Sequence, residues 1–475
     1  MRAFSAIVKL TLRSAMRSHI FQLLLGLLVL CAVMLPMTVS GSGEGARSYI
    51  QIALMYSLGT VGFILALSTV WISSLVMTQD VESYQLHMVV SKPVSRIKIF
   101  CAKYASVVLL HAVLLGLAGI TIFGGVMWRF AQDDIPEEEK ERIRNEVLVG
   151  RRVYYPEPPD MDKLTREALA QQLEEMRKAG NRQVTAQAGE MEAELRKGLS
   201  QEMLRQRSEV LFQKYGEWTF KDLPQDKSKP IYLRYRCYVG KVDSEAQRYT
   251  TGLWAGYIVE RKQEAMNNQT VAQEDYTRNW MALSQMPEQN YAGEFHEKVM
   301  PPQVIDPDGN VNLRYINLDN AQDKVYFQTV DGPKLLISVS SFAGNFIRGL
   351  LVILLMVMVY AGITCAVAAA FSMPTAIFAV LSYMFLGSVA PLIMTTSQLA
   401  DPSKYAGYWI GKVIMKIVAP LQEFEISYKI ASGELVEFSY IGGLFCEHFL
   451  LQALPFIVLG VFLYWRRELG LVIRK

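Results

Sequence analysis

The sequence contains few of the residues on which redox and metal chemistry usually depend. It has five cysteines and five histidines in 475 residues. Four cysteines lie in or beside strongly apolar runs, so Cys237 is the only cysteine of the polar segment 129–340. A disulfide within that segment is therefore excluded, and a segment of this length must be stabilised by its own hydrophobic core.

Motifs that would signal catalysis are also missing. The chain has no G-x-x-x-x-G-K-[ST] phosphate loop, no H-E-x-x-H zinc site and no G-x-S-x-G nucleophile elbow. The nearest string to a phosphate loop, "GYWIGKV", has the wrong spacing. We therefore expect a chain that is not an enzyme, holds no metal or cofactor and does not hydrolyse ATP by itself. An active site assembled from distant residues remains an open alternative.

The chain also lacks a large excess of positive or negative charge. A formal net charge of +3 is too small to indicate binding to nucleic acid. Long apolar runs are abundant, and each is long enough to cross a hydrocarbon core of about 30 Å. The sequence therefore predicts a polytopic helical membrane protein with six spans, at residues 20–38, 52–77, 104–127, 346–371, 375–396 and 442–465.

The basic residues indicate an orientation. Because six is an even number, both termini lie on one side, and the excess of Lys and Arg makes that side cytoplasmic. The segment 129–340 is then extracytoplasmic, and we expect a multi-pass protein of a bacterial cytoplasmic membrane. The basic residues that carry this argument are Arg2, Lys9, Arg13, Arg17, Lys92, Arg96, Lys98, Lys103, Arg466, Arg467, Arg474 and Lys475.

The long polar insert, residues 129–340, has two parts that differ in composition. From 133 to 215 the chain is highly charged, with apolar residues at helical intervals from Lys163 onward, which predicts a helical hairpin or stalk. From 216 to 340 short alternating runs such as "NLRYINL" and the Asp308-Gly309 turn predict a β-sandwich. The insert is therefore expected to be an α+β domain, without an assigned ligand.

Two amphipathic segments flank the spans. Residues 3–17 place apolar and basic side chains at helical spacing, which predicts an interfacial helix within the first domain, residues 1–128. A simple basic flank is the alternative. In the last domain, residues 341–475, the segment 398–440 carries Tyr405, Trp409, Val413 and Ile417 at fourfold spacing. That spacing indicates a helix on the outer membrane surface, ended by Pro420.

Three ionisable residues fall inside predicted spans. His111 lies in the third, and Glu447 and His448 lie in the sixth. Buried ionisable groups in lipid are costly and frequently mark function. The other interpretation is packing against polar groups, and adjacent helical residues do not face each other, so Glu447 and His448 are not a ready-made pair.

The segment between the second and third spans, "DVESYQLHMVVSKPVSRIKIFCAK", is the most specific feature. It resembles the cytoplasmic segment of the ATP-binding-cassette type 2 permease family, in which acidic residues lead through an apolar stretch to Pro-x-Ser-Arg and a Lys. The chain departs from this pattern at Tyr84-Gln85 and Ala102. Matching features are the acidic Asp80 and Glu82, the apolar Leu86, Met88 and Val90, and the Pro93, Ser95, Arg96 and Lys103 positions.

The resemblance implies a function for this coupling segment, residues 79–103. It implies a permease subunit, in an exporter, that docks a separate cytoplasmic ATPase, which binds ATP and Mg²⁺, and that pairs with a second permease copy or paralogue. Three alternatives remain open. The segment is only a topogenic loop, the chain is a membrane scaffold or mechanotransmitter whose insert binds envelope partners, or it is an intramembrane enzyme.

Overall fold

The computed structural model describes most of the chain, and its residues form two compact units, 1–150 with 339–475, and 151–338. Each unit is considered by itself. The described residues are 2–17, 19–38, 45–82, 94–158, 208–224, 229–240, 249–261, 276–320, 324–328, 331–396 and 406–466, with 166–167, 170–171, 174 and 198.

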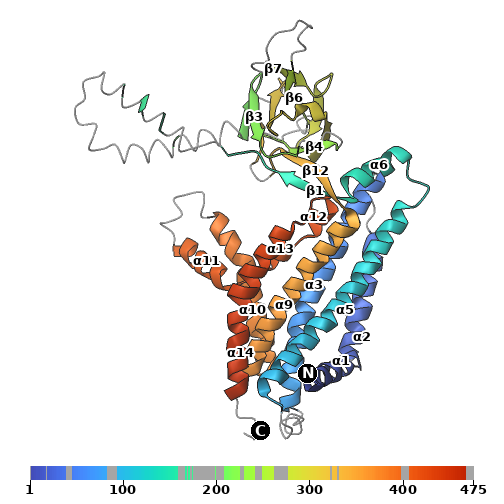
Figure 1. Cartoon of the computed structure of the whole chain (residues 1–475), viewed down its shortest axis with the longest axis vertical. Helices are drawn as coiled ribbons and strands as arrows, with labels where there is room; N and C mark the ends of the chain where they lie inside the picture. The colour runs from blue at the N-terminus through green and yellow to red at the C-terminus, as the bar shows by residue number, and fades with distance from the viewer. Residues whose placement is uncertain are drawn as a thin grey trace, which may run out of the picture. The chain divides into compact units, whose positions relative to one another are not determined.

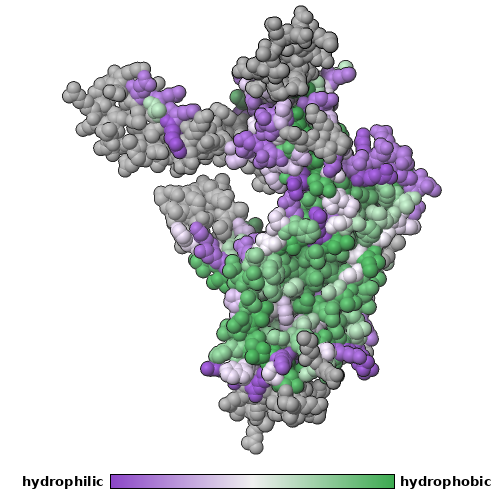
Figure 2. Space-filling model, in the orientation of Figure 1, coloured by the Kyte–Doolittle hydropathy of each residue, from purple (hydrophilic) through white to green (hydrophobic). Residues whose placement is uncertain are grey.

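Five helical segments of the first unit are long and apolar enough to cross a membrane. They correspond to the second to sixth apolar runs of the sequence, and green apolar side chains cover much of their surface in Figure 2. Figure 1 shows them side by side in a bundle. The helices are α3 (Gly45–Glu82), α5 (Arg96–Phe130), α9 (Phe342–Ala370), α10 (Met373–Thr396) and the last segment, α13 (Phe438–Leu444) continued through a π-helix into α14 (Leu454–Arg466).

The first apolar run forms α2 (His19–Thr38). It follows α1 (Arg2–Arg17), in which Lys9, Arg13 and Arg17 are exposed beside exposed apolar residues such as Leu10. The axes of α1 and α2 differ by 67°. The pair adds a sixth candidate span only if both helices are counted as one broken element.

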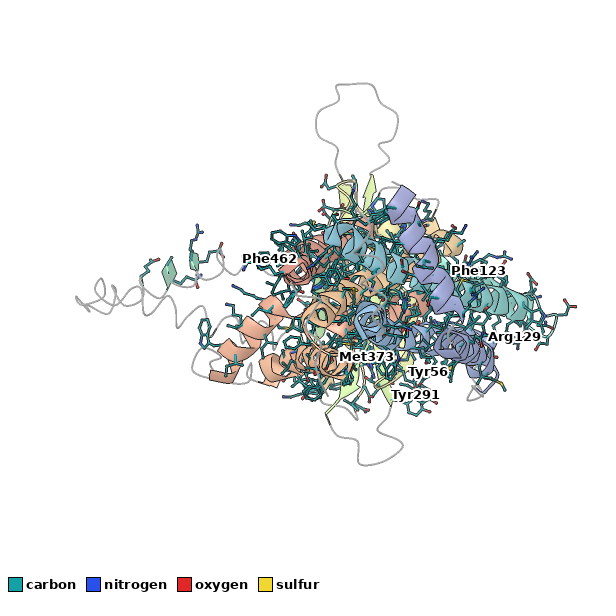
Figure 3. The ribbon with its side chains drawn as sticks, turned by 90° about the horizontal axis from the view of Figure 1, so that it is seen from below. Tyr56, Phe123, Arg129, Tyr291, Met373 and Phe462 are labelled. Atoms are coloured by element: carbon teal, nitrogen blue, oxygen red, sulfur yellow. The ribbon has the colours of Figure 1, made fainter. Side chains whose placement is uncertain are left out.

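Helix α9 lies at the centre of the bundle and is the most buried of the candidate spans. Small residues let its neighbours approach closely. At Gly460 of α14, an added Cβ would lie 2.4 Å from the Cα of Ala366 on α9. Figure 3, viewed along the helices, shows Phe462 of the same helix at the edge of the bundle. The α9–α14 contact therefore requires glycine at position 460.

Substituting Gly460 by Val should destabilise the bundle, because overpacking a close contact costs about 1–3 kcal/mol. Thermal unfolding of the full chain in detergent should occur several degrees lower. Gly124→Val is the matched control, since a Cβ on that α5 glycine meets nothing within 4 Å. Equal losses in both variants would contradict the close-packing role of Gly460.

The second unit is rich in β-sheet, as the sequence predicts. One sheet has the strand order β1 (Val149–Tyr154), β12 (Lys334–Ser341), β4 (Ile231–Arg236) and β9 (Phe295–Met300). A smaller sheet has the order β2 (Glu209–Leu211), β11 (Lys324–Tyr326) and β5 (Tyr238–Val239). The largest sheet has the order β3 (Tyr215–Phe220), β10 (Val311–Asn317), β6 (Tyr249–Arg261), β7 (Tyr276–Ala282), with β8 (Glu288–Tyr291) also on β6. Apolar residues of all three sheets share one core.

Aromatic rings fill the centre of that core. The ring centroid of Trp254 lies 4.9 Å from that of Tyr235, 5.2 Å from Tyr315 and 5.5 Å from Trp218. Cys237 is buried in the same cluster, and burial raises the pKa of its thiol to about 12. This packing stands in place of the disulfide that the sequence excludes.

The alternation of apolar and polar residues predicts the burial pattern correctly for β10 and incorrectly for β4. β10 buries every second residue, and Gly309 makes the predicted turn with φ +79°. In β4 the polar Arg234 is as buried as its apolar neighbours, because it pairs with Glu297 on β9. Arg151 of β1 shares that carboxylate at 2.8 Å, so buried ion pairing removes the polar outer face that alternation predicts.

The region 133–215 is not wholly helical. It contains α6 (Glu137–Glu146), but β1 and β2 also lie inside it, because each pairs with a strand near the end of the insert, β12 and β11. These partners are distant in sequence, so a local helical pattern does not reveal them. Most of the predicted helical hairpin from Lys163 onward lies outside the described residues.

Burial of Cys237 predicts very slow reaction with thiol reagents. With a pKa of about 12, almost no thiolate exists at pH 8, and the folded core excludes the reagent. The test uses the full chain with the other four cysteines replaced by alanine. Labelling should become fast only in denaturant, whereas fast labelling of the native protein would contradict the buried position.

Candidate functional site

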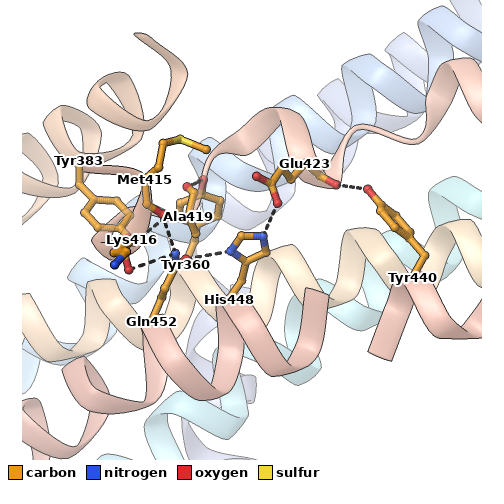
Figure 4. Close-up of polar contacts among 9 residues, drawn as sticks. All are labelled: Tyr360, Tyr383, Met415, Lys416, Ala419, Glu423, Tyr440, His448 and Gln452. Atoms are coloured by element: carbon orange, nitrogen blue, oxygen red, sulfur yellow. Dashed lines mark hydrogen bonds and ion pairs between the residues drawn. The ribbon is translucent and has the colours of Figure 1, made fainter. Parts of the chain in front are cut away.

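A cluster of polar contacts among the described residues of the helical unit surrounds the connection between α11 (Ala406–Ile417) and the short 3₁₀ helix η5 (Leu421–Phe424). We call residues 415–423 the α11–η5 connection. Figure 4 shows side chains of α9, α10 and the last helical segment converging on it. As predicted, α11 ends before Pro420, which lacks the N–H that a further helical turn needs.

Backbone groups of this connection are satisfied by side chains. The Gln452 amide donates to the carbonyl oxygens of Met415 and Lys416, at 3.2 and 3.4 Å. The Tyr383 hydroxyl donates to Ile417 O at 3.1 Å and accepts from Ala419 N–H at 2.9 Å. The last carbonyls of a helix lack intrahelical partners, so these bonds cap the end of α11.

Two further tyrosines extend the same arrangement. The Tyr360 hydroxyl of α9 donates to Ala419 O at 3.0 Å, and the Tyr440 hydroxyl of α13 donates to the backbone oxygen of Glu423 at 2.5 Å. Tyr360 is fully buried. Four side chains from three different spans therefore fix the path of the α11–η5 connection.

A π-helix, Phe445–Ala453, interrupts the last span next to this connection. Pro455 is the second residue after it, and Leu454 N–H bonds to Phe449 O, five residues earlier. A proline inside a helix clashes with the carbonyl four residues before it, and widening the preceding turn relieves that clash. π-Helical turns are rare in proteins, and those that occur are frequently found at functional sites. His448 and Gln452 both lie in this turn.

His448 links the π-helix to η5. Its Nδ1 lies 2.8 Å from Oε1 of Gln452, and its Nε2 lies 2.6 Å from Oε2 of Glu423. The His448 side chain is only 1% exposed, whereas Glu423 is 38% exposed. A ligand atom of Glu447 also lies within 4.8 Å of those of Glu423 and His448. The sequence predicts no metal-ligand set, yet the fold assembles three potential ligands here.

His111 occupies a different environment. Its Nδ1 lies 2.9 Å from Val107 O and its Nε2 lies 3.1 Å from the Ser68 hydroxyl of α3. The ring is completely buried. The hydrogen bonds found among the described residues do not join His111 to the His448 cluster, and polar packing accounts for its position.

The coupling segment is described only at its two flanks. Asp80 and Glu82 belong to the last turns of α3. Ser95 is the N-cap of α5, where its hydroxyl accepts from Lys98 N–H at 3.4 Å. Leu86, Met88, Val90 and Pro93 lie outside the described residues.

Two basic side chains tie these flanks to the bundle. The Arg96 guanidinium donates to Trp465 O, near the end of α14, at 2.9 Å. Lys103 is 2% exposed and donates to Val76 O of α3 at 2.7 Å. A shared apolar cluster lies beside these contacts, formed by Met77, Ile99, Phe100, Cys365, Ala368, Ala369, Ala376 and Tyr464. The start of α5 is therefore bonded to the ends of both α3 and α14.

Sequence reasoning found His448 and Glu447 but missed Glu423 and Gln452, which bond His448, and Tyr360 and Tyr383, which bond the α11–η5 connection. Glu423, Tyr360 and Tyr383 lie on other elements than His448, so no local pattern relates them to it. One signal was available: Pro455 within an apolar run indicates a disturbed helix, whose freed backbone groups need side-chain partners.

Comparisons with known proteins found no match. No protein-family model, curated protein or solved structure resembles the chain at a significant level.

Replacing Tyr383 by Phe should loosen the α11–η5 connection. The variant loses one donated and one accepted hydrogen bond, worth about 1–3 kcal/mol together. Hydrogen exchange of the full chain should show about ten- to hundredfold faster exchange at residues 417–419. Tyr56→Phe is the control, because that α3 tyrosine is 52% exposed. Unchanged protection in Tyr383→Phe would show that other contacts hold the connection.

Proposed function

We propose that the chain is the permease subunit of an ATP-binding-cassette exporter, driven by a separate cytoplasmic ATPase. The observation that supports this proposal is that hydrogen bonds at the flanks of the coupling segment join three helices, α3, α5 and α14. Arg96 bonds α5 to α14, and Lys103 bonds α5 to α3. The resemblance of residues 80–103 to the type 2 permease segment supplies the identity of the partner.

These contacts suggest how force would enter the bundle. Movement of a docked ATPase would displace the start of α5 together with the ends of α3 and α14, because their backbone carbonyls are bonded to α5 side chains. The last span runs from Phe438 to Arg466, carries Tyr440 near its other end and carries His448 and Gln452 near its middle. That span would therefore pass displacement from the coupling segment to the α11–η5 connection.

The same proposal includes a topology. Six spans, with the α1–α2 pair containing the first, place both termini and the coupling segment in the cytoplasm. The insert 129–340 is then extracytoplasmic, in a bacterial inner membrane. A second permease copy or a paralogue would complete the transporter, and exposed aromatic side chains on α3 and α10, such as Phe63 and Phe385, leave apolar surface for it. Fold and topology carry no information about the substrate.

Charge reversal in the coupling segment should weaken ATPase docking. Glu82→Lys and Lys98→Glu should each reduce association with the cognate ATPase, sought among those encoded beside this gene, by about tenfold, equal to about 1.4 kcal/mol. Lys98 is exposed in the first turn of α5, and its hydrogen bond to Ser95 is made by its backbone N–H. Association is measured with the full chain in nanodiscs.

Arg142→Glu provides the control, because its side chain is 63% exposed on α6, beyond the far end of α5. That variant should dock normally. Failure of every candidate ATPase to bind the unmodified chain would contradict the proposal and favour a membrane scaffold. Equal docking by all three variants would reject the coupling segment as the docking surface.

A further inference from the structure

We propose that Glu423, Glu447 and His448 form a binding site for a divalent transition metal ion, with Zn²⁺ as the best-suited ion. The three ligand atoms, two carboxylate oxygens and one imidazole nitrogen, lie within 4.8 Å of one another. They come from two elements, η5 and the π-helix of the last span. This proposal concerns the chain itself and is independent of an ATPase partner.

The hydrogen bonds of Gln452 determine which ring nitrogen of His448 carries a hydrogen and which one faces the carboxylates. Gln452 uses its amide nitrogen to donate to the carbonyls of Met415 and Lys416. Its Oε1 must therefore be the atom that faces His448 Nδ1, and an amide oxygen only accepts. Nδ1 consequently carries the hydrogen, which leaves Nε2 as the nitrogen that faces the carboxylates.

Neutral His448 would then present a lone pair to a carboxylate oxygen at 2.6 Å. Two acceptors at that distance repel each other unless a cation lies between them. The cation is either a proton on Nε2 or a metal ion. A neutral imidazole whose other nitrogen donates to an orienting oxygen is the usual arrangement of a histidine metal ligand.

The donor set favours zinc over magnesium. Zn²⁺ accepts mixed imidazole and carboxylate ligands at about 2.0–2.2 Å, whereas Mg²⁺ requires a near-octahedral shell of oxygens. Glu447 is exposed, so its carboxylate can adjust toward the ion, while buried His448 is held in place by Gln452. Glu423 and Glu447 both reach the surface of the helical bundle, whereas His448 does not.

Binding would fasten η5 to the last span. Glu423 belongs to the α11–η5 connection, and the other two ligands belong to the π-helix. A metal bridge across them would add to the hydrogen bonds that four side chains already make with the connection. Metal should therefore slow hydrogen exchange at residues 415–423 and raise the unfolding temperature.

The test is zinc binding by the full chain, purified without a histidine tag, stripped with chelator and carrying Cys446→Ser, which removes an adjacent exposed thiol. Calorimetry with ZnCl₂ should show one tight site per chain, with MnCl₂ weaker and MgCl₂ not binding. X-ray absorption of the zinc complex should show one imidazole among oxygen ligands.

Glu447→Gln is the decisive variant, because it leaves the bonds of His448 to Glu423 and Gln452 intact and should fold normally. It should weaken zinc binding at least tenfold, and His448→Gln should abolish it. Glu437→Gln, at the residue directly before α13, should bind zinc like the parent chain. Absence of stoichiometric zinc binding, or equal affinity in Glu447→Gln, would overturn the proposal and leave a proton as the cation between His448 and Glu423.

Discussion

The need to satisfy every backbone polar group inside the helical unit governs much of this structure. In a hydrocarbon environment an unpaired carbonyl costs several kcal/mol, so non-helical backbone persists there only where side chains replace the missing partners. The α11–η5 connection meets that requirement through Gln452, Tyr383 and Tyr360. Pro455 creates a related problem within the last span, and the π-helix before it is the local solution. The π-helical turn also presents His448 and Gln452 to the connection.

Charged side chains in the bundle obey the same constraint. Lys103 and Arg96 direct their N–H groups at main-chain carbonyls of α3 and α14, so each charge is solvated by a backbone oxygen of a neighbouring helix. This arrangement joins three helices at one end of the bundle. The last span therefore has fixed contacts at both of its ends, with α5 at one and with the α11–η5 connection at the other. Such a span is suited to transmit movement, which is the physical basis of the permease proposal.

Several features of the fold could be predicted because they depend on local composition. Apolar runs of about twenty residues identify helices whatever their neighbours are, and strict alternation identified β10. The candidate site could not be predicted in this way. His448 and Glu423 are twenty-five residues apart, and Tyr360 lies on a different helix from either. Arg234 shows the same limit, since its burial depends on Glu297 of a strand distant in sequence.

The sequence by itself determined the class of the protein: a polytopic helical chain interrupted by a β-rich insert that no disulfide stabilises. Hydrophobicity and periodicity are properties of consecutive residues, so they can be read from the sequence without knowing which residues are in contact. Tertiary structure alone decided which polar groups meet. A hydrogen bond or ion pair depends on two positions within about 3 Å, and such proximity arises only when separate helices pack. The contact between His448 and Glu423, and the bonds that join Arg96 and Lys103 to other helices, belong to that second category.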